Sequence, residues 1–154
     1  MKLKIFNLFI NMVYKIRTKF YKPIFSSFGI NSRVLGRIKV YSPQNIFFGN
    51  NSTLNEGVLL DARAKLIIGN HVHISSYTII NTGGLDYTKK MEKRKHLSKK
   101  VKIEDGVWIG SGVIINPGIT IGKNSVIAAG SVVTKDIPEN VIAAGVPAKI
   151  IKNI

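Results

Sequence analysis

The stretch from Ile103 to Pro138 reads IEDGVWIGSGVIINPGITIGKNSVIAAGSVVTKDIP, and its spacing decides the fold. An apolar β-branched residue occupies every sixth position without a slip, at Ile103, Ile109, Ile115, Ile121, Ile127 and Val133. The residue that follows each of them is usually small or polar. A period of six predicts short strands joined by tight turns, with three hexads making one triangular coil of about 18 residues.

The same period appears upstream in two sets separated by a two-residue slip: Phe48, Leu54, Leu60 and Ile68, Ile74, Ile80. Glycine and asparagine cluster at the expected corners, as in Gly122-Lys123-Asn124, where the chain must bend with positive φ. A β-sandwich of short strands would also alternate polar and apolar residues, but it gives no reason for a strict period of six. The repeat therefore favours an all-β solenoid whose coils bury their apolar side chains only against their neighbours.

Composition agrees with one β-rich domain. The 154 residues include 37 isoleucines and valines against 9 leucines, and β-branched side chains suit strands. An apolar content of 45% excludes wholesale disorder. Because the chain has no cysteine, disulfides, thiolate ligands and a cysteine nucleophile are excluded.

Two segments depart from the repeat and set the expected organisation. Residues 1–30 form a basic N-terminal arm, and residues 31–154 form the β-helical domain, interrupted by a polar loop at 81–102. Long loops without secondary structure of their own are usually functional. The loop is therefore expected to border the site.

The arm carries apolar residues with helical spacing at positions 5, 6, 9, 12, 13, 16 and 20, with lysines among or beside them. Two interpretations remain open and are compatible. The helix covers the open end of the coil stack, as terminal repeats require, or it lies on an anionic membrane surface. The apolar stretch is too short to span a bilayer, and no small-residue cleavage site follows it, so a secretory signal peptide is disfavoured.

The large positive net charge is the most unusual feature of the composition. The chain has 23 Lys and Arg against 8 Asp and Glu, a net charge of +15, and its first acid is Glu56. A polyanion such as nucleic acid is the first interpretation, but no base-stacking or groove-reading motif accompanies the charge. The excess gathers in residues 1–55 and in the loop, which favours an anionic cofactor, an anionic glycan or a membrane over nucleic acid.

The run from Ile103 to Pro138, followed by Ala144-Gly-Val-Pro-Ala-Lys149, resembles the hexapeptide-repeat acyltransferases. Within them it is most similar to the galactoside and maltose O-acetyltransferases and their capsule and lipopolysaccharide relatives. The resemblance implies a left-handed parallel β-helix and a homotrimer, with acetyl-CoA and a sugar or glycan acceptor meeting in clefts between subunits. It implies no metal.

The resemblance also implies which residues bind the cofactor. Small side chains there let the pantetheine arm lie against backbone amides, and lysine suits phosphate. By position, the cofactor residues are Ser111, Ala129, Thr134, Lys135, Lys149 and Lys152.

Histidine is the natural general base, because its ordinary pKa lies near neutrality. In many relatives the catalytic histidine follows a Thr-Gly pair in the loop, but here Gly84 or Leu85 holds that place. His96, in the same loop, is the expected base, with Asp86 or Glu92 as its carboxylate partner. His73 is the second candidate, while His71 is expected to be a surface residue.

The expected function is transfer of acetyl from acetyl-CoA to a sugar hydroxyl in surface polysaccharide biosynthesis, in the cytoplasm or at the inner face of the membrane. An N-acetyltransferase acting on an amino sugar stays open, since the hexads do not discriminate hydroxyl from amine. A γ-carbonic-anhydrase-like enzyme would need His71, His73 and His96 on one zinc, and their spacing disfavours it. A non-catalytic β-helix that only binds or assembles is the remaining alternative.

Overall fold

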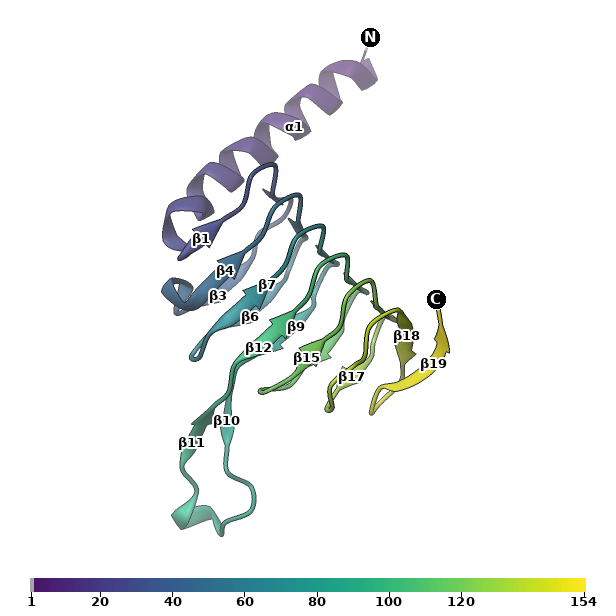
Figure 1. The fold of residues 1–154 in the computed structure, drawn as a ribbon. Helices are drawn as coiled ribbons and strands as arrows, with labels where there is room; N and C mark the ends of the chain where they lie inside the picture. The colour runs from purple at the N-terminus through teal and green to yellow at the C-terminus, as the bar shows by residue number, and fades with distance from the viewer. Residues whose placement is uncertain (1) are drawn as a thin grey trace.

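The computed structural model describes the backbone of residues 2–154 and the side chains of residues 3–154. One long helix, α1 (Lys2–Tyr21), leads into a stack of triangular coils whose strands form three parallel sheets (Figure 1). The fold is a parallel β-helix of the hexapeptide-repeat type, as the period of six predicts.

Each coil contributes one strand to each face. Sheet A contains β1 (Ser27–Phe28), β4 (Ile46–Phe48), β7 (Leu66–Ile68), β12 (Val101–Ile103) and β15 (Thr120–Ile121). Sheet B contains β2 (Arg33–Val34), β5 (Thr53–Leu54), β8 (His73–Ile74), β13 (Trp108–Ile109), β16 (Val126–Ile127), β18 (Val141–Ala144) and β19 (Lys149–Asn153). Sheet C contains β3 (Lys39–Tyr41), β6 (Leu59–Asp61), β9 (Ile79–Asn81), β14 (Ile114–Ile115) and β17 (Val132–Val133).

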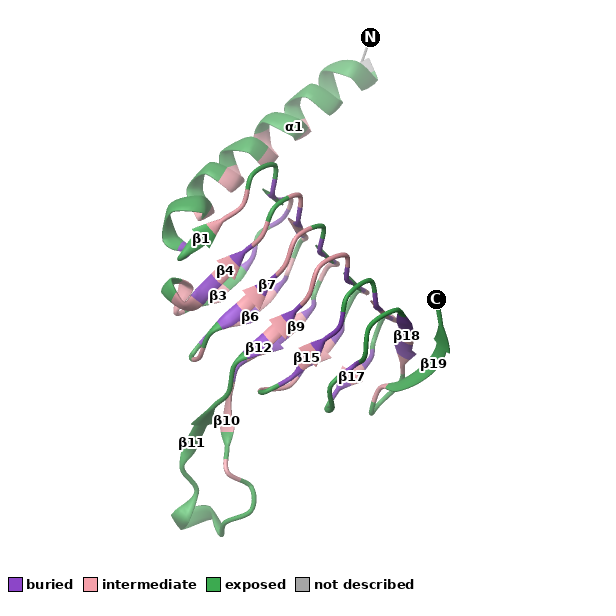
Figure 2. Ribbon diagram, viewed as in Figure 1, coloured by how far each residue is buried: buried purple, intermediate pink, exposed green. Residues whose placement is uncertain are grey.

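The apolar residues of the repeat form three buried columns, one behind each sheet. Ile103 pairs with Ile68 and Ile121 in sheet A. The equivalent triplets are Ile74, Ile109, Ile127 in sheet B and Ile80, Ile115, Val133 in sheet C. All nine side chains are almost fully buried, and burial of each contributes about 1.5–3 kcal/mol relative to exposure. Figure 2 shows that buried residues recur along the strands of the stack.

The two-residue slip in the sequence also has a structural counterpart. Phe48 pairs with Ile68, Leu54 with Ile74 and Leu60 with Ile80, so this coil advances by 20 residues. The coil before it advances by the same amount, because Phe28 pairs with Phe48. The β-helix therefore begins at β1, inside the segment that the sequence assigns to the arm.

Both ends of the stack are covered. The last turns of α1 lie on the first coil, where Arg17 Nη1 donates to the carbonyl of Leu35 at 3.1 Å and Tyr21 Oη donates to that of Ile38 at 3.1 Å. At the other end β19 pairs antiparallel with β18. Three short 3-10 helices, at Lys22–Ile24, Pro43–Asn45 and Met91–Lys93, lie outside the sheets.

The interrupting segment projects from the stack as a hairpin (Figure 1). Within the loop expected at 81–102, β10 (Gly83–Leu85) pairs antiparallel with β11 (His96–Ser98). Asn81 still belongs to β9, and Val101 already belongs to β12. None of the described helices is long and apolar enough to cross a membrane.

Candidate functional site

In the fourth and fifth coils, the edge between sheets B and C is built from small residues stacked one on another. Gly112 N donates to the carbonyl of Ser76, and Gly130 N donates to that of Ser111, each at 2.9 Å. Ser111 and Ala129 therefore occupy equivalent corners of neighbouring coils. A Cβ atom at Gly110 would lie 2.5 Å from the backbone nitrogen of Ala129, so only glycine fits there. The result is a narrow strip of exposed backbone, here called the BC edge.

The expected phosphate-binding lysines extend this strip. Lys149 pairs with Ala144, and Lys152 pairs with Ile142, both across the antiparallel β18–β19 pair. Both lysine side chains are exposed. Lys149 therefore lies close to the end of the BC edge, where an anionic group could contact it.

Thr134 and Lys135 lie at a different corner. They directly follow β17, at the edge between sheets C and A, here called the CA edge. The width of sheet C separates them from Ser111 and Ala129. The structure thus places Ser111, Ala129 and Lys149 along one edge and Thr134 and Lys135 on the other.

The hairpin leaves the stack from the CA edge, on the third coil. Gly84 lies beside the next coil, because a Cβ placed on it would be 3.6 Å from Pro117 Cγ. His96 is exposed and pairs directly with Leu85 across the hairpin. Cross-strand partners share one face with Cβ atoms about 5 Å apart. His96 therefore projects beside Leu85, one of the two positions where the family resemblance leads one to expect a histidine.

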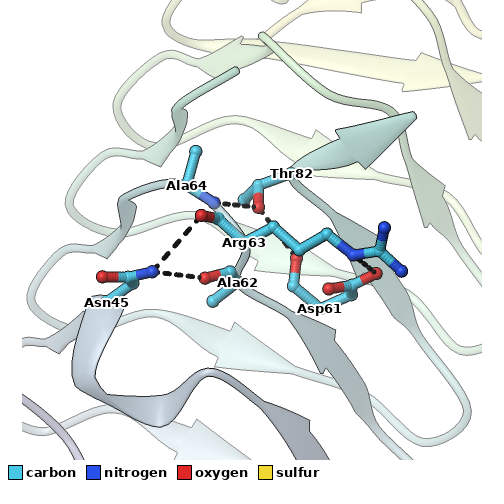
Figure 3. A network of polar contacts seen from close by, with 6 residues as sticks. All are labelled: Asn45, Asp61, Ala62, Arg63, Ala64 and Thr82. Carbon is cyan, nitrogen blue, oxygen red and sulfur yellow. Dashed lines mark hydrogen bonds and ion pairs between the residues drawn. The ribbon is translucent and has the colours of Figure 1, made fainter. Parts of the chain in front are cut away.

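The base of the hairpin is fixed by a polar network (Figure 3). The buried hydroxyl of Thr82 accepts from the backbone nitrogen of Ala64 at 2.8 Å and donates to the carbonyl of Asp61 at 2.9 Å. Asn45 Nδ2 donates to the carbonyl of Ala62 at 2.8 Å. These bonds tie the start of the hairpin to the two preceding coils.

A carboxylate that the sequence pattern does not single out lies in this network. Asp61 Oδ2 is 3.3 Å from Arg63 Nε, whose side chain passes over Gly83. Asp61 Oδ1 is buried and has no hydrogen-bond partner among the described residues. In the sequence, Asp61 is marked only by its position directly after the repeat residue Leu60. Many other small or polar residues occupy the equivalent position after a repeat residue.

The two expected carboxylate partners of His96 lie elsewhere on the hairpin. Asp86 accepts from Thr88 Oγ1 at 2.5 Å and from Thr88 N at 3.1 Å, and these bonds hold the pKa of its carboxyl below the usual value. Glu92 lies in the short helix at the tip. No hydrogen bond joins either carboxylate to His96 among the side chains that the structure describes.

The other two histidines lie away from the hairpin. His71 adopts φ +54° at the corner between sheets A and B, here called the AB edge. His73 is in β8, where its Nδ1 lies 2.9 Å from Thr53 Oγ1. Within residues 3–154, no three His, Asp or Glu side chains gather as metal ligands.

The BC edge contains one residue that the sequence pattern does not predict. The left-handed corner position is glycine at Gly57, Gly112 and Gly130, but it is Tyr77 in the third coil, with φ +61°. A bulky side chain there costs about 1–2 kcal/mol. The Tyr77 ring covers Gly57 and remains 66% exposed beside Ser76. Strained residues of this kind concentrate at functional sites, and the break in the glycine column is the signal that marks it.

Comparisons with known proteins agree with this fold. A model of bacterial transferase hexapeptide repeats matches residues 100–135. A hexapeptide-repeat acetyltransferase of Vibrio cholerae, solved with acetyl-CoA, is 33% identical, with a TM-score of 0.83 over 90% of this chain and 76% of that one. Among curated proteins, no sequence matches this chain.

Two further solved structures are similar. A maltose O-acetyltransferase from Clostridium difficile 630 is 40% identical over 92% of this chain and 76% of its own, with a TM-score of 0.83. A galactoside acetyltransferase in complex with coenzyme A is 38% identical over 90% of this chain and 70% of its own, also with a TM-score of 0.83.

We expect Tyr77 to serve binding at the BC edge at the expense of backbone strain. Tyr77→Gly removes the strain, and the added freedom of the unfolded chain offsets most of that gain, so the free energy of unfolding should change by less than about 1 kcal/mol. The affinity for coenzyme A should nevertheless fall severalfold, as measured by titration calorimetry. Unchanged affinity with unchanged stability would show that Tyr77 only covers Gly57.

Proposed function

Because the chain belongs to the hexapeptide-repeat acetyltransferases, we propose that it transfers an acetyl group from acetyl-CoA to a sugar hydroxyl. The acceptor is a surface glycan or its precursor, and the protein works in the cytoplasm or at the inner face of the membrane. Three relatives that are at least 33% identical support the acetyl-CoA-dependent chemistry, and two of them were solved with acetyl-CoA or coenzyme A. The narrow strip at the BC edge supports the place of the cofactor.

The pantetheine arm lies along the BC edge, where the side chains of Ser111 and Ala129 are small enough to leave the backbone accessible. Lys149 and Lys152 contact the phosphates of the cofactor as point charges. Thr134 and Lys135, on the CA edge, reach a cofactor bound to the same chain only around sheet C. The family resemblance assigns both residues to the far end of the cofactor.

His96 acts as the general base, and the observation that carries this assignment is its pairing with Leu85. The imidazole takes the proton of the acceptor hydroxyl while that oxygen attacks the thioester carbonyl carbon. A backbone N–H stabilises the oxyanion that forms. When the tetrahedral intermediate collapses, the carbon–sulfur bond breaks, and the leaving thiolate takes the proton back from His96. The products are the acetyl ester and coenzyme A.

The site is completed between subunits. In one chain, Ser111 and Ala129 lie at the BC edge, whereas the hairpin leaves from the opposite edge of sheet C and exposes all of β11 to solvent. A base needs a fixed, partly desolvated position to work efficiently. A homotrimer satisfies this need when the hairpin of one copy reaches the BC edge of the next, as a closed ring of heterologous contacts allows.

An N-acetyltransferase remains the nearest alternative, because an amine could occupy the place of the hydroxyl. The product distinguishes the two, since hydroxylamine cleaves an acetyl ester and leaves an amide intact. A non-catalytic β-helix would retain the fold without turnover on any acceptor. Zinc analysis of the purified protein tests the γ-carbonic-anhydrase alternative.

His96→Ala should lower kcat by about 100-fold or more while leaving the affinity for coenzyme A unchanged, because the base acts only in the chemical step. The measurement is acetyl-CoA turnover with a panel of sugars and lipid-linked glycans. His71→Ala is the matched control, since His71 lies at another edge of the β-helix. Full activity in His96→Ala would refute the base assignment.

Mixing two inactive variants tests the shared site. Ala129→Leu fills the proposed cofactor site at the BC edge, and His96→Ala removes the base, so neither protein is active alone. After joint refolding, about one interface in four pairs an intact hairpin with an intact BC edge, and about a quarter of the wild-type activity should return. If mixed refolding restores nothing while trimers form normally, the site lies within one chain.

We also propose that α1 contacts an anionic membrane surface in addition to covering the first coil. One face of the helix points away from the body, and its apolar side chains are 50–71% exposed: Ile5, Phe9, Met12, Ile16 and Phe20. The described helix contains no acidic residue. Apolar and basic side chains on one helix suit the interface of an anionic bilayer, whereas a second copy of the same basic arm would be repelled.

Ile5→Ser combined with Phe9→Ser should abolish co-sedimentation with phosphatidylglycerol vesicles, because the helix loses apolar area that enters the interface. Ile30→Ser, on the β-helix, is the control for an exposed isoleucine. Phosphatidylcholine vesicles should bind the wild-type protein weakly. If the double variant sediments normally, or loses its trimeric state instead, the helix contacts protein and not lipid.

A further inference from the structure

A basic groove lies between α1 and the first three coils, with a volume of about 900 Å³. It is lined by Lys15 and Lys19 of α1, by Lys22 of the 3-10 helix that follows, and by Arg33 and His73 of the β-helix. Neutral polar residues, including Asn31, Asn51 and Thr53, line it further, and none of its lining residues is acidic.

The lysines face the groove together because of their spacing along the helical segment. Lys15 and Lys19 are spaced i, i+4 on α1, and Lys22 follows three residues later in the 3-10 helix. The three lysines therefore lie on one side of this helical segment, next to its exposed apolar face. The helix is fixed in this orientation because Val34 N donates to Thr18 Oγ1 at 3.0 Å, between the lysines. This contact holds α1 against the strand that contains Arg33, so that the lysines line the groove.

The polar side chains on the floor of the groove are also held in place. Thr53 Oγ1 and His73 Nδ1 are 2.9 Å apart on neighbouring strands, which fixes the imidazole and leaves Nε2 free of that contact. Arg33 pairs with Thr53 in the strand before. The three strands span about 10 Å, so the polar floor is longer than a single phosphate.

These charges lack protein partners. The two ion pairs among the described side chains, Asp61–Arg63 and Lys102–Glu104, lie outside the groove. Four like charges around one concave surface repel one another and raise the local potential, and a bound anion would relieve this. The length of the floor and the spread of the four cations match two linked phosphates better than one.

We propose that the groove binds the pyrophosphate of an acceptor that carries its sugar on a diphosphate. This proposal rests on the proposed function and names its substrate class. The groove is distinct from the cofactor strip, because it lies against α1 and sheet B of the first three coils, whereas Ser111 and Ala129 belong to later coils. Leu8 and Tyr14, also in its lining, provide an apolar wall for the group beyond the diphosphate.

Binding of inorganic pyrophosphate, measured by titration calorimetry at two salt concentrations, tests the proposal without requiring turnover. The wild-type protein should bind it, and more weakly at high salt. The combined variant Lys15→Gln, Lys19→Gln and Arg33→Gln should weaken binding at least tenfold. A variant with the same loss of charge elsewhere, Lys89→Gln, Lys90→Gln and Lys123→Gln, should retain it.

Further arms identify the source of the pyrophosphate and separate the two proposals. Binding of uridine diphosphate glucose points to a soluble sugar nucleotide, and selective binding to neutral vesicles doped with a polyprenyl pyrophosphate points to a lipid-linked glycan. Equal affinity for pyrophosphate in the two triple variants would overturn the assignment of pyrophosphate binding to this groove. Failure of the wild-type protein to bind coenzyme A while pyrophosphate still binds would overturn the proposed function and leave the groove.

Discussion

The structure depends on the stacking of one buried apolar side chain on its equivalent one coil away. Ile109 illustrates the constraint, since it lies between Ile74 and Ile127 and is fully buried. Each strand is only two or three residues long in most coils, so no strand is stable alone. The columns set the register of every coil, and the corners must then bend with positive φ, for which asparagine and glycine are suited.

This constraint divides the chain between scaffold and site. The residues at inward positions are fixed by packing, whereas those at corners and outward positions are free to vary. The candidate site residues, such as Ser111, Ala129 and Lys149, occupy corners and outward positions. Ser111 and Ala129 lie at one edge, and the hairpin leaves from another, where Thr82 anchors it to earlier coils. The proposed cofactor site at the BC edge and the proposed base, His96, are thus held apart in one chain, and the proposed trimer would bring them together.

Charge follows the same division. None of the described lysines is buried inside the coils, and the excess of positive charge lies on α1, on the hairpin and on the outer face of the first coils. The groove beneath α1 arises because this helix packs beside β2, β5 and β8, which begin 12 to 52 residues after the helix ends. A net charge of +15 therefore describes several local surfaces and not a uniform field.

The period of six by itself determined the β-helix, because a residue that must be buried every sixth position permits few other chain paths. It also located the interrupting segment, whereas Ser111 and Ala129 were predicted from the family resemblance. The sequence did not determine that His96 faces Leu85, that Tyr77 replaces glycine in a corner column, or that Lys15 and Arg33 share a groove. Those facts depend on pairing between distant segments, which has no local pattern, and only the tertiary structure decided them.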